Sequence, residues 1–186
     1  MPVMELSASQ DRAFFEAVCA KSGQDLLRCY QCGNCTAGCP MQPYYDLAAH
    51  QVMRLVQTGQ RKAALTCSSL WLCAGCGQCS ARCPNQLDVA LILETLRHMA
   101  RRAGYNPQPR VAQFSRAFLK SVHSHGRVFE LGLLLRYKLA SGRLLDDADL
   151  APRLLKVGKL HLTPTSTPGQ AEVAAIFRRY EQGAGS

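Results

Sequence analysis

The chain has 186 residues, 47% of them hydrophobic, and a formal net charge of +9 at pH 7. This length and composition are sufficient for a buried core and exclude a wholly disordered protein. The longest apolar stretch, around residues 128–135, contains Glu130 and is too short to cross a bilayer, and residues 1–10 hold no apolar signal segment, so we expect a cytoplasmic protein without a transmembrane anchor.

A helix is the first element that the sequence predicts. Ser7 or Ser9 is a suitable N-cap, and Gly23 is a suitable end. Between them lies an apolar stripe with helical spacing, formed by Phe14, Phe15, Val18 and Cys19. We expect Cys19 to behave as a small buried hydrophobic residue.

Two cysteine runs follow, and the second repeats the first 44 positions later. Each run has the form C-x2-C-x2-C-x3-C-P. The first contains Cys29, Cys32, Cys35 and Cys39, and the second contains Cys73, Cys76, Cys79 and Cys83. Three cysteines at steps of three residues can deliver three thiolates from one tight loop to three corners of a cubane. We therefore expect these loops to hold two [4Fe–4S] clusters.

Other uses of these cysteines fit the pattern less well. Two C-x2-C pairs suffice for structural zinc, so the third cysteine of each run would have no function. Disulfides need an oxidising compartment, and cysteines three apart in tight loops are poorly placed for pairing. Tyr30 and Trp71 flank the predicted ligands, where they either shield a cluster from water or pack in the core.

Helices are also predicted on both sides of the second run. Pro43 suits the first turn of a helix that ends before Gly59, and Arg61–Leu65 is predicted to be a short turn. Asp88 is a suitable N-cap for a helix that ends at Gly104. Because no stretch here alternates like a strand, the expected fold class is all-α.

Cys67 lies six residues before the second run and belongs to neither run. We expect a buried structural thiol, while an alternative cluster ligand or a reactive thiolate remains open.

The excess of positive charge lies in one segment. Residues 97–160 contain thirteen of the 22 Lys and Arg residues but four of the 13 Asp and Glu residues. This segment could be a solvated face, or it could bind a partner protein or nucleic acid. We divide the chain into a helical di-cluster domain at residues 1–106 and a basic helical extension with a C-terminal arm, for subunit docking, at residues 107–186.

Within this extension, two amphipathic helices are expected at residues 111–122 and 128–139, with His123 and His125 as structural residues of the turn between them. Residues 144–169 are expected to be an irregular arm that wraps a partner, and residues 171–180 a last short helix.

The two runs resemble those of bacterial two-cluster ferredoxins, in which the fourth cysteine of each run ligates the other cluster. This resemblance implies a helical ferredoxin-like domain with crossed ligand sets. The first cluster would take Cys29, Cys32, Cys35 and Cys83, and the second would take Cys73, Cys76, Cys79 and Cys39. Such domains also occur in succinate dehydrogenases, so the pattern alone does not identify a pathway.

A wider set of motifs resembles the C subunit of heterodisulfide reductase from about residue 10 onward. They are Trp71-Leu72-Cys73, the segment from Val122 to Gly132 (VHSHGRVFELG), Tyr137-Lys138-Leu139 and Gly158-Lys159-Leu160. The resemblance implies an electron-transfer subunit. It would connect the A subunit, which bears flavin and iron–sulfur clusters, to the catalytic B subunit, which has Cys-Cys-Gly motifs. This chain contains neither Cys-Cys-Gly nor G-x-G-x-x-G, so we expect no catalytic residue here.

Two alternatives remain open. One is the iron–sulfur subunit of another flavin dehydrogenase, of succinate or glycerol-phosphate type, although the N-terminal C-x4-C-x2-C site of succinate-type subunits is absent from this sequence. The other is an iron–sulfur regulatory protein that binds nucleic acid through its basic segment, which we do not expect.

Overall fold

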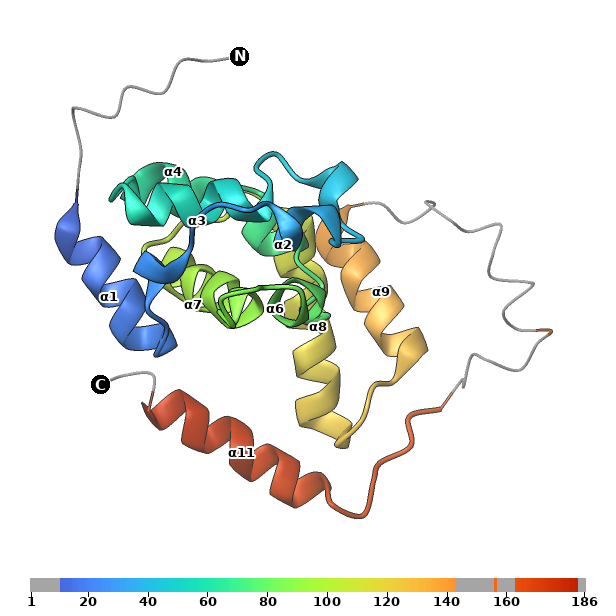
Figure 1. The fold of residues 1–186 in the computed structure, drawn as a ribbon. Helices are drawn as coiled ribbons and strands as arrows, with labels where there is room; N and C mark the ends of the chain where they lie inside the picture. The colour runs from blue at the N-terminus through green and yellow to red at the C-terminus, as the bar shows by residue number, and fades with distance from the viewer. Residues whose placement is uncertain (1–10, 143–155, 157–162, 184–186) are drawn as a thin grey trace. The chain divides into compact units, whose positions relative to one another are not determined.

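The computed structural model describes residues 11–142, 156 and 163–183 (Figure 1). The chain divides into two compact units between Gln108 and Pro109. All regular structure in the described ranges is helical, which confirms the expected all-α class, whereas the ferredoxin-like arrangement of two clusters stays a prediction. In those ranges, no helix is long and apolar enough to cross a membrane.

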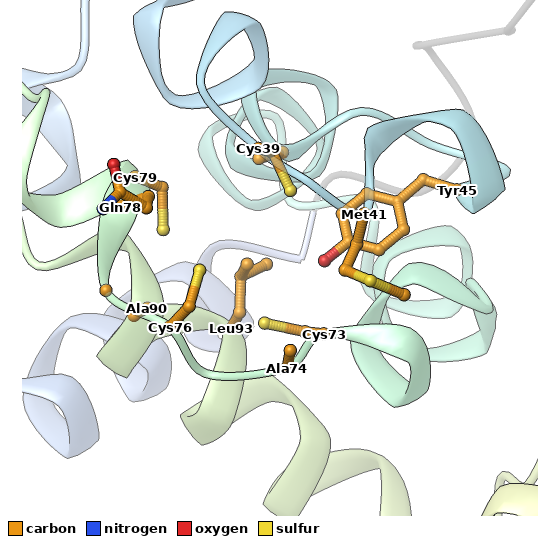
Figure 2. Close-up of a pocket in the computed structure, with 12 residues that line it drawn as sticks. Cys39, Met41, Tyr45, Cys73, Ala74, Cys76, Gln78, Cys79, Ala90 and Leu93 are labelled. Carbon is orange, nitrogen blue, oxygen red and sulfur yellow. The ribbon is translucent and has the colours of Figure 1, made fainter.

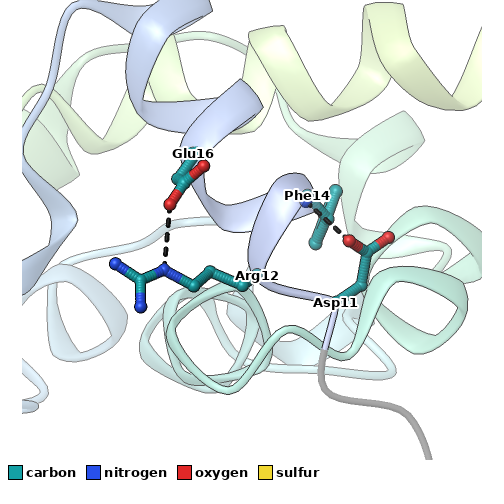
Figure 3. A network of polar contacts seen from close by, with 4 residues as sticks. All are labelled: Asp11, Arg12, Phe14 and Glu16. Atoms are coloured by element: carbon teal, nitrogen blue, oxygen red, sulfur yellow. Dashed lines mark hydrogen bonds and ion pairs between the residues drawn. The ribbon is translucent and has the colours of Figure 1, made fainter.

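The first helix, α1, spans Arg12–Ser22 and ends at Gly23 in the left-handed conformation, as predicted. Its N-cap is Asp11, whose Oδ1 accepts a hydrogen bond of 2.8 Å from the amide of Phe14 (Figure 3). The prediction of a cap at Ser7 or Ser9 is therefore wrong, and both serines lie outside the described residues. A carboxylate at the N-cap satisfies an unpaired amide and complements the positive end of the helix dipole.

Helix α7, Val89–Arg102, is the element around which the first unit packs. Asp88 caps it by accepting from the amide of Leu91, as predicted, and Gly104 follows its C-cap with φ +76°. The helix contacts α1, α4, α5 and α6. The fully buried core around it includes Phe14, Leu26, Met53, Leu65, Leu70 and Leu96.

The segment between the cysteine runs differs from the prediction at two places. Pro43 lies in a short 3-10 turn, η2 (Gln42–Tyr44), and helix α3 begins only at Ala49 and ends at Gln57. The intervening Tyr45 is extended, which stops the turn from continuing into the helix. The predicted turn at Arg61–Leu65 is instead helix α4, Arg61–Thr66, where Ala64 and Leu65 are fully buried. Helix α5, Ser69–Leu72, leads directly into the second run.

Each cysteine run contains one short helix, although both were expected to be loops throughout. These are α2, Asn34–Ala37, and α6, Gln78–Ala81. Glycine in the left-handed conformation precedes both helices, and the two helices contact each other.

The second unit contains α8 (Pro109–His125), α9 (Glu130–Ser141) and α11 (Gln170–Gly183), and α8 contacts the other two. Both expected helices and the last helix are confirmed. His123 and His125 lie in the last turn of α8 rather than in the connecting turn, because α8 continues to Gly126 at φ +72°. The His123 ring contacts the ring of Phe177 on α11, with centroids 5.1 Å apart. Most of the expected irregular arm, residues 144–169, lies outside the described residues.

Candidate iron–sulfur site

The internal repeat of the sequence is also a repeat of backbone conformation. Gly33 and Gly77 occupy equivalent positions and have φ values of +80° and +73°. Gln31 and Gly75 also occupy equivalent positions, and both have φ of +64°. Left-handed backbone is costly for a residue with a Cβ, so glycine is expected at such positions and glutamine is not.

Solvent exposure repeats between the runs in the same way. Cys32 and the equivalent Cys76 are exposed, whereas Cys35 and the equivalent Cys79 are buried, at 8% and 9% exposure. The remaining four cysteines of the runs are half-buried: Cys29, Cys39, Cys73 and Cys83. In each run, the second cysteine is thus a solvent-exposed residue and the third is a buried one.

One pocket is lined by three cysteines of the second run together with the fourth cysteine of the first. These are Cys73, Cys76, Cys79 and Cys39 (Figure 2). Their sulfur atoms point toward the space between them, and Met41 and Leu93 are among the apolar residues that complete the lining. Four soft thiol donors in a largely apolar pocket are a donor set that suits an iron–sulfur cluster.

For the other four cysteines of the runs, the arrangement is seen from the contacts of neighbouring residues. The Asn85 side chain, two residues after Cys83, donates a hydrogen bond to the carbonyl of Arg28, next to Cys29. This bond holds the end of the second run beside the start of the first. The Tyr30 side chain is 62% exposed, but partial desolvation of its hydroxyl, together with the nearby thiols of Cys32 and Cys83, raises the pKa of Tyr30.

Cys35 and Cys79 lie at the interior of the site. Burial raises the pKa of both thiols, whereas the neighbouring hydroxyls of Thr36 and Ser80 lower it by hydrogen bonding. The charge of Cys79 also raises the pKa of Cys35, and the short helices that carry these two cysteines, α2 and α6, contact each other.

Thr36 and Ser80 are site residues that the sequence analysis missed. They occupy equivalent positions in the repeat, and each accepts a hydrogen bond from the second amide of the helix that follows its run. The amide of His50 donates to Thr36 Oγ1 over 3.2 Å, and that of Ala90 donates to Ser80 Oγ over 3.0 Å. Both hydroxyls therefore connect the short helix that holds a buried cysteine to a core helix. Their shared position after the third cysteine is a signal that could have found them.

Tyr45 is a second residue that the sequence analysis missed. It lines the pocket in Figure 2, and burial, followed by the proximity of Cys73 and Cys39, raises the pKa of its hydroxyl. By contrast, Tyr30 is 62% exposed and shields little of the site from water. Nothing in the spacing separates Tyr45 from the exposed Tyr44 beside it, so only the tertiary structure identifies it.

Asp46 connects the segment after the first run to the segment before the second. Its carboxylate accepts hydrogen bonds from the hydroxyl of Ser69 at 2.6 Å and from the amides of Ser68 and Ser69 at 2.8 and 3.0 Å. It also accepts from the amide of Leu47 at 2.9 Å. Partial burial raises the pKa of Asp46, but these hydrogen bonds outweigh it and hold the pKa below its usual value.

Cys67 and Cys19 lie outside this arrangement. Cys67 is 3% exposed, its Sγ donates to the carbonyl of Ala64 over 3.3 Å, and burial raises its pKa to about 11. The expectation that this thiol is buried is confirmed. Cys19 is half-buried and packs against the core.

A single metal ion requires at least three ligating side chains gathered around one point. Among residues 11–142, 156 and 163–183, no three Cys, His, Asp or Glu side chains are close enough to hold one ion. The four sulfurs described above line a pocket and do not form the closed coordination sphere of one ion.

Comparison with known families identifies the region. Residues 28–88 match the family of 4Fe-4S dicluster domains. A 4Fe-4S dicluster domain is therefore present in this chain. It includes all eight cysteines of the two runs, together with Asp46 and the equivalent pair Thr36 and Ser80.

The chain that carries this dicluster domain is also similar to two curated proteins. They are the C subunits of the H(2):CoB-CoM heterodisulfide,ferredoxin reductases of Methanothermobacter thermautotrophicus and Methanothermobacter marburgensis. Each is 30% identical over 95 residues, which is 51% of this chain and 51% of the relative. The matched part thus spans about half the length of these relatives. The resemblance to the C subunit of heterodisulfide reductase is confirmed over that part.

Proposed function

We propose that this chain is an electron-transfer subunit of a heterodisulfide reductase-like complex. It would relay electrons through two [4Fe–4S] clusters between an A subunit, which bears flavin and iron–sulfur clusters, and a catalytic B subunit, which has Cys-Cys-Gly motifs. The observation that carries the proposal is the pocket that gathers Cys39 with Cys73, Cys76 and Cys79, because it combines sulfurs of both runs in the pattern expected for crossed ligation.

The ligand sets follow from this arrangement. In our proposal, those four sulfurs bind one cluster. The other cluster binds to the three remaining cysteines of the first run and to Cys83, and the bond from Asn85 to the carbonyl of Arg28 supports this assignment. Each bound cluster supplies a carrier for one electron at a time. The chain provides the thiolates, excludes water around the buried sulfurs and fixes the distance between the two sites.

The alternation of buried and exposed cysteines suggests a route. Cys35 and Cys79 are buried and lie on α2 and α6, which contact each other, so in our proposal they lie between the two sites. Cys32 and Cys76 are exposed, so each site has one edge that a partner protein can approach. We propose that electrons enter at one exposed edge, pass the buried pair and leave at the other.

The second unit is the proposed docking region for a partner protein of the complex. Helices α8 and α9 carry large apolar side chains that are exposed in this chain, which is uncommon unless another surface covers them. These residues are Phe114, Phe118, Leu119, Leu134, Leu135 and Leu139. Exposed basic residues lie on the same helices, so a partner surface with apolar and acidic groups would complement them.

Anaerobic affinity purification from the native host tests this function directly. We expect a flavoprotein and a protein with Cys-Cys-Gly motifs to copurify, and about eight iron and eight sulfide per chain, as two cubanes require. Recovery of the chain alone or with nucleic acid, with both clusters intact, would overturn the proposed function and leave the cofactor assignment standing.

Serine substitution tests the crossed ligation. Cys39→Ser is expected to alter the cluster held by the second run, and Cys83→Ser the cluster held by the first. The two clusters are distinguished by electron paramagnetic resonance after partial reduction. Cys67→Ser is the matched control, because this buried cysteine belongs to neither run, and it should leave both spectra unchanged. Damage confined to the cluster of the substituted run would contradict crossed ligation.

A further inference from the structure

Gln31 has an unusual backbone for its residue type. It lies between Cys29 and Cys32 with φ of +64°, and the equivalent position in the second run is Gly75 with the same φ. A side chain at such a position destabilises the fold relative to glycine. The first run therefore has glutamine, with a strained backbone, at a position where the second run has glycine, which adopts the same φ without strain.

The Gln31 side chain has a defined orientation. Its Nε2 donates to Cys29 Sγ over 3.4 Å and to Oε1 of Gln57 over 3.4 Å. Gln57 cannot be reversed, because its own Nε2 donates to the carbonyls of Leu26 and Cys29 at 2.9 and 2.8 Å. Its oxygen must therefore face Gln31, which in turn requires the amide nitrogen of Gln31 to face the sulfur.

We propose that the Gln31 side chain raises the reduction potential of the cluster bound by Cys29. This inference rests on the proposed function, because it assumes that Cys29 is a cluster ligand. Adding one electron makes the cluster and its thiolates more negative, so a hydrogen bond to a ligand sulfur stabilises the reduced form more than the oxidised form. The electron comes from the reduced flavin or iron–sulfur partner of the complex. Gly75, at the equivalent position, has no side-chain amide to donate to Cys73, so the two runs differ at this point.

The test is a redox titration of the purified holoprotein, followed by electron paramagnetic resonance. Gln31→Gly and Gln31→Ala both remove the donor, but only the glycine variant also relieves the backbone strain. In both variants, we expect about a tenfold lower ratio of reduced to oxidised cluster at a fixed solution potential, which corresponds to a midpoint about 59 mV more negative. The cluster concerned is identified as the one whose spectrum changes in Cys29→Ser. The other cluster should keep its midpoint.

A matched control separates the donor from the backbone. Gln86 is the other non-glycine residue at positive φ in the described ranges, and its side chain is exposed near Cys83. Gln86→Gly should leave both midpoints unchanged. A shift in Gln31→Gly without one in Gln31→Ala would assign the effect to strain and overturn the inference. Two intact clusters with unchanged midpoints in both Gln31 variants would overturn this inference alone, whereas a wild-type protein without two clusters would overturn the proposed function as well.

Discussion

Replacement of Asp46 with alanine is expected to destabilise the dicluster domain, because this carboxylate connects the segment after the first cysteine run to the segment before the second. Its Oδ1 accepts from the Ser69 hydroxyl and from the amides of Ser69 and Leu47, and its Oδ2 accepts from the amide of Ser68. The amides of Ser68 and Ser69 lie at the start of α5, where no preceding helical turn provides an acceptor.

The magnitude follows from the number and type of these bonds. A hydrogen bond to a charged group contributes about 1.5–3 kcal/mol when buried, and loss of a helix cap costs about 1 kcal/mol. Asp46 is largely exposed, so water can replace part of what is lost. We expect a loss of about 2–3 kcal/mol, which lowers the unfolding midpoint of a protein of this size by about 4–12 °C.

Anaerobic thermal unfolding, followed by circular dichroism and by cluster absorbance, measures this change. Asp25→Ala is the matched control, because Asp25 is also exposed and also caps a short helix, yet its side chain accepts a single bond, 3.0 Å from the amide of Leu27. Asp46→Ala should lower the midpoint clearly more than Asp25→Ala. Equal shifts in the two variants would refute the role assigned to Asp46.

The pH dependence of the Asp46 contribution has a definite sign. The native pKa lies below the usual value of 3.8, so the ionised carboxylate favours the folded state. Its contribution is complete above about pH 5 and is lost as the pH falls through the usual value toward the native pKa. The difference between wild type and Asp46→Ala should therefore be the same at pH 7 and pH 5.5.

Two further predictions concern the same unit. Gly59→Ala should destabilise it by more than about 1 kcal/mol, because φ is +67° and a Cβ would lie 2.6 Å from the backbone nitrogen of Asp11. Gly23→Ala is the control: φ is +63° but the space around it is open, so the loss of stability should be smaller. Equal unfolding midpoints of the two variants would contradict this. Burial raises the pKa of Cys67 to about 11, so this thiol should resist alkylation by iodoacetamide at pH 8 in the folded holoprotein and react after denaturation. Peptide mass spectrometry measures the labelling. Rapid labelling of the folded protein would refute the burial of Cys67.

Features that depend on local spacing were predictable from the amino-acid sequence. They include the two cysteine runs, the cap at Asp88 and the stop at Gly23, because each depends on residues within one turn or loop. The same reasoning placed the helices of the second unit correctly except at their ends. It failed at Arg61–Leu65, where a short helix is stabilised by burial of Ala64 and Leu65 against other helices rather than by caps of its own.

Which distant residues share a site depends on the tertiary structure. No spacing rule places Tyr45 in the pocket with Cys73, or joins Asp46 to the start of α5, because these contacts depend on how α3 and α5 pack against the core. The strained conformation of Gln31 was equally invisible in the sequence. A residue 26 positions away, Gln57, fixes the direction of the Gln31 side chain toward the sulfur of Cys29. Local patterns thus define the candidate ligands, whereas long-range packing defines the polar groups that surround them.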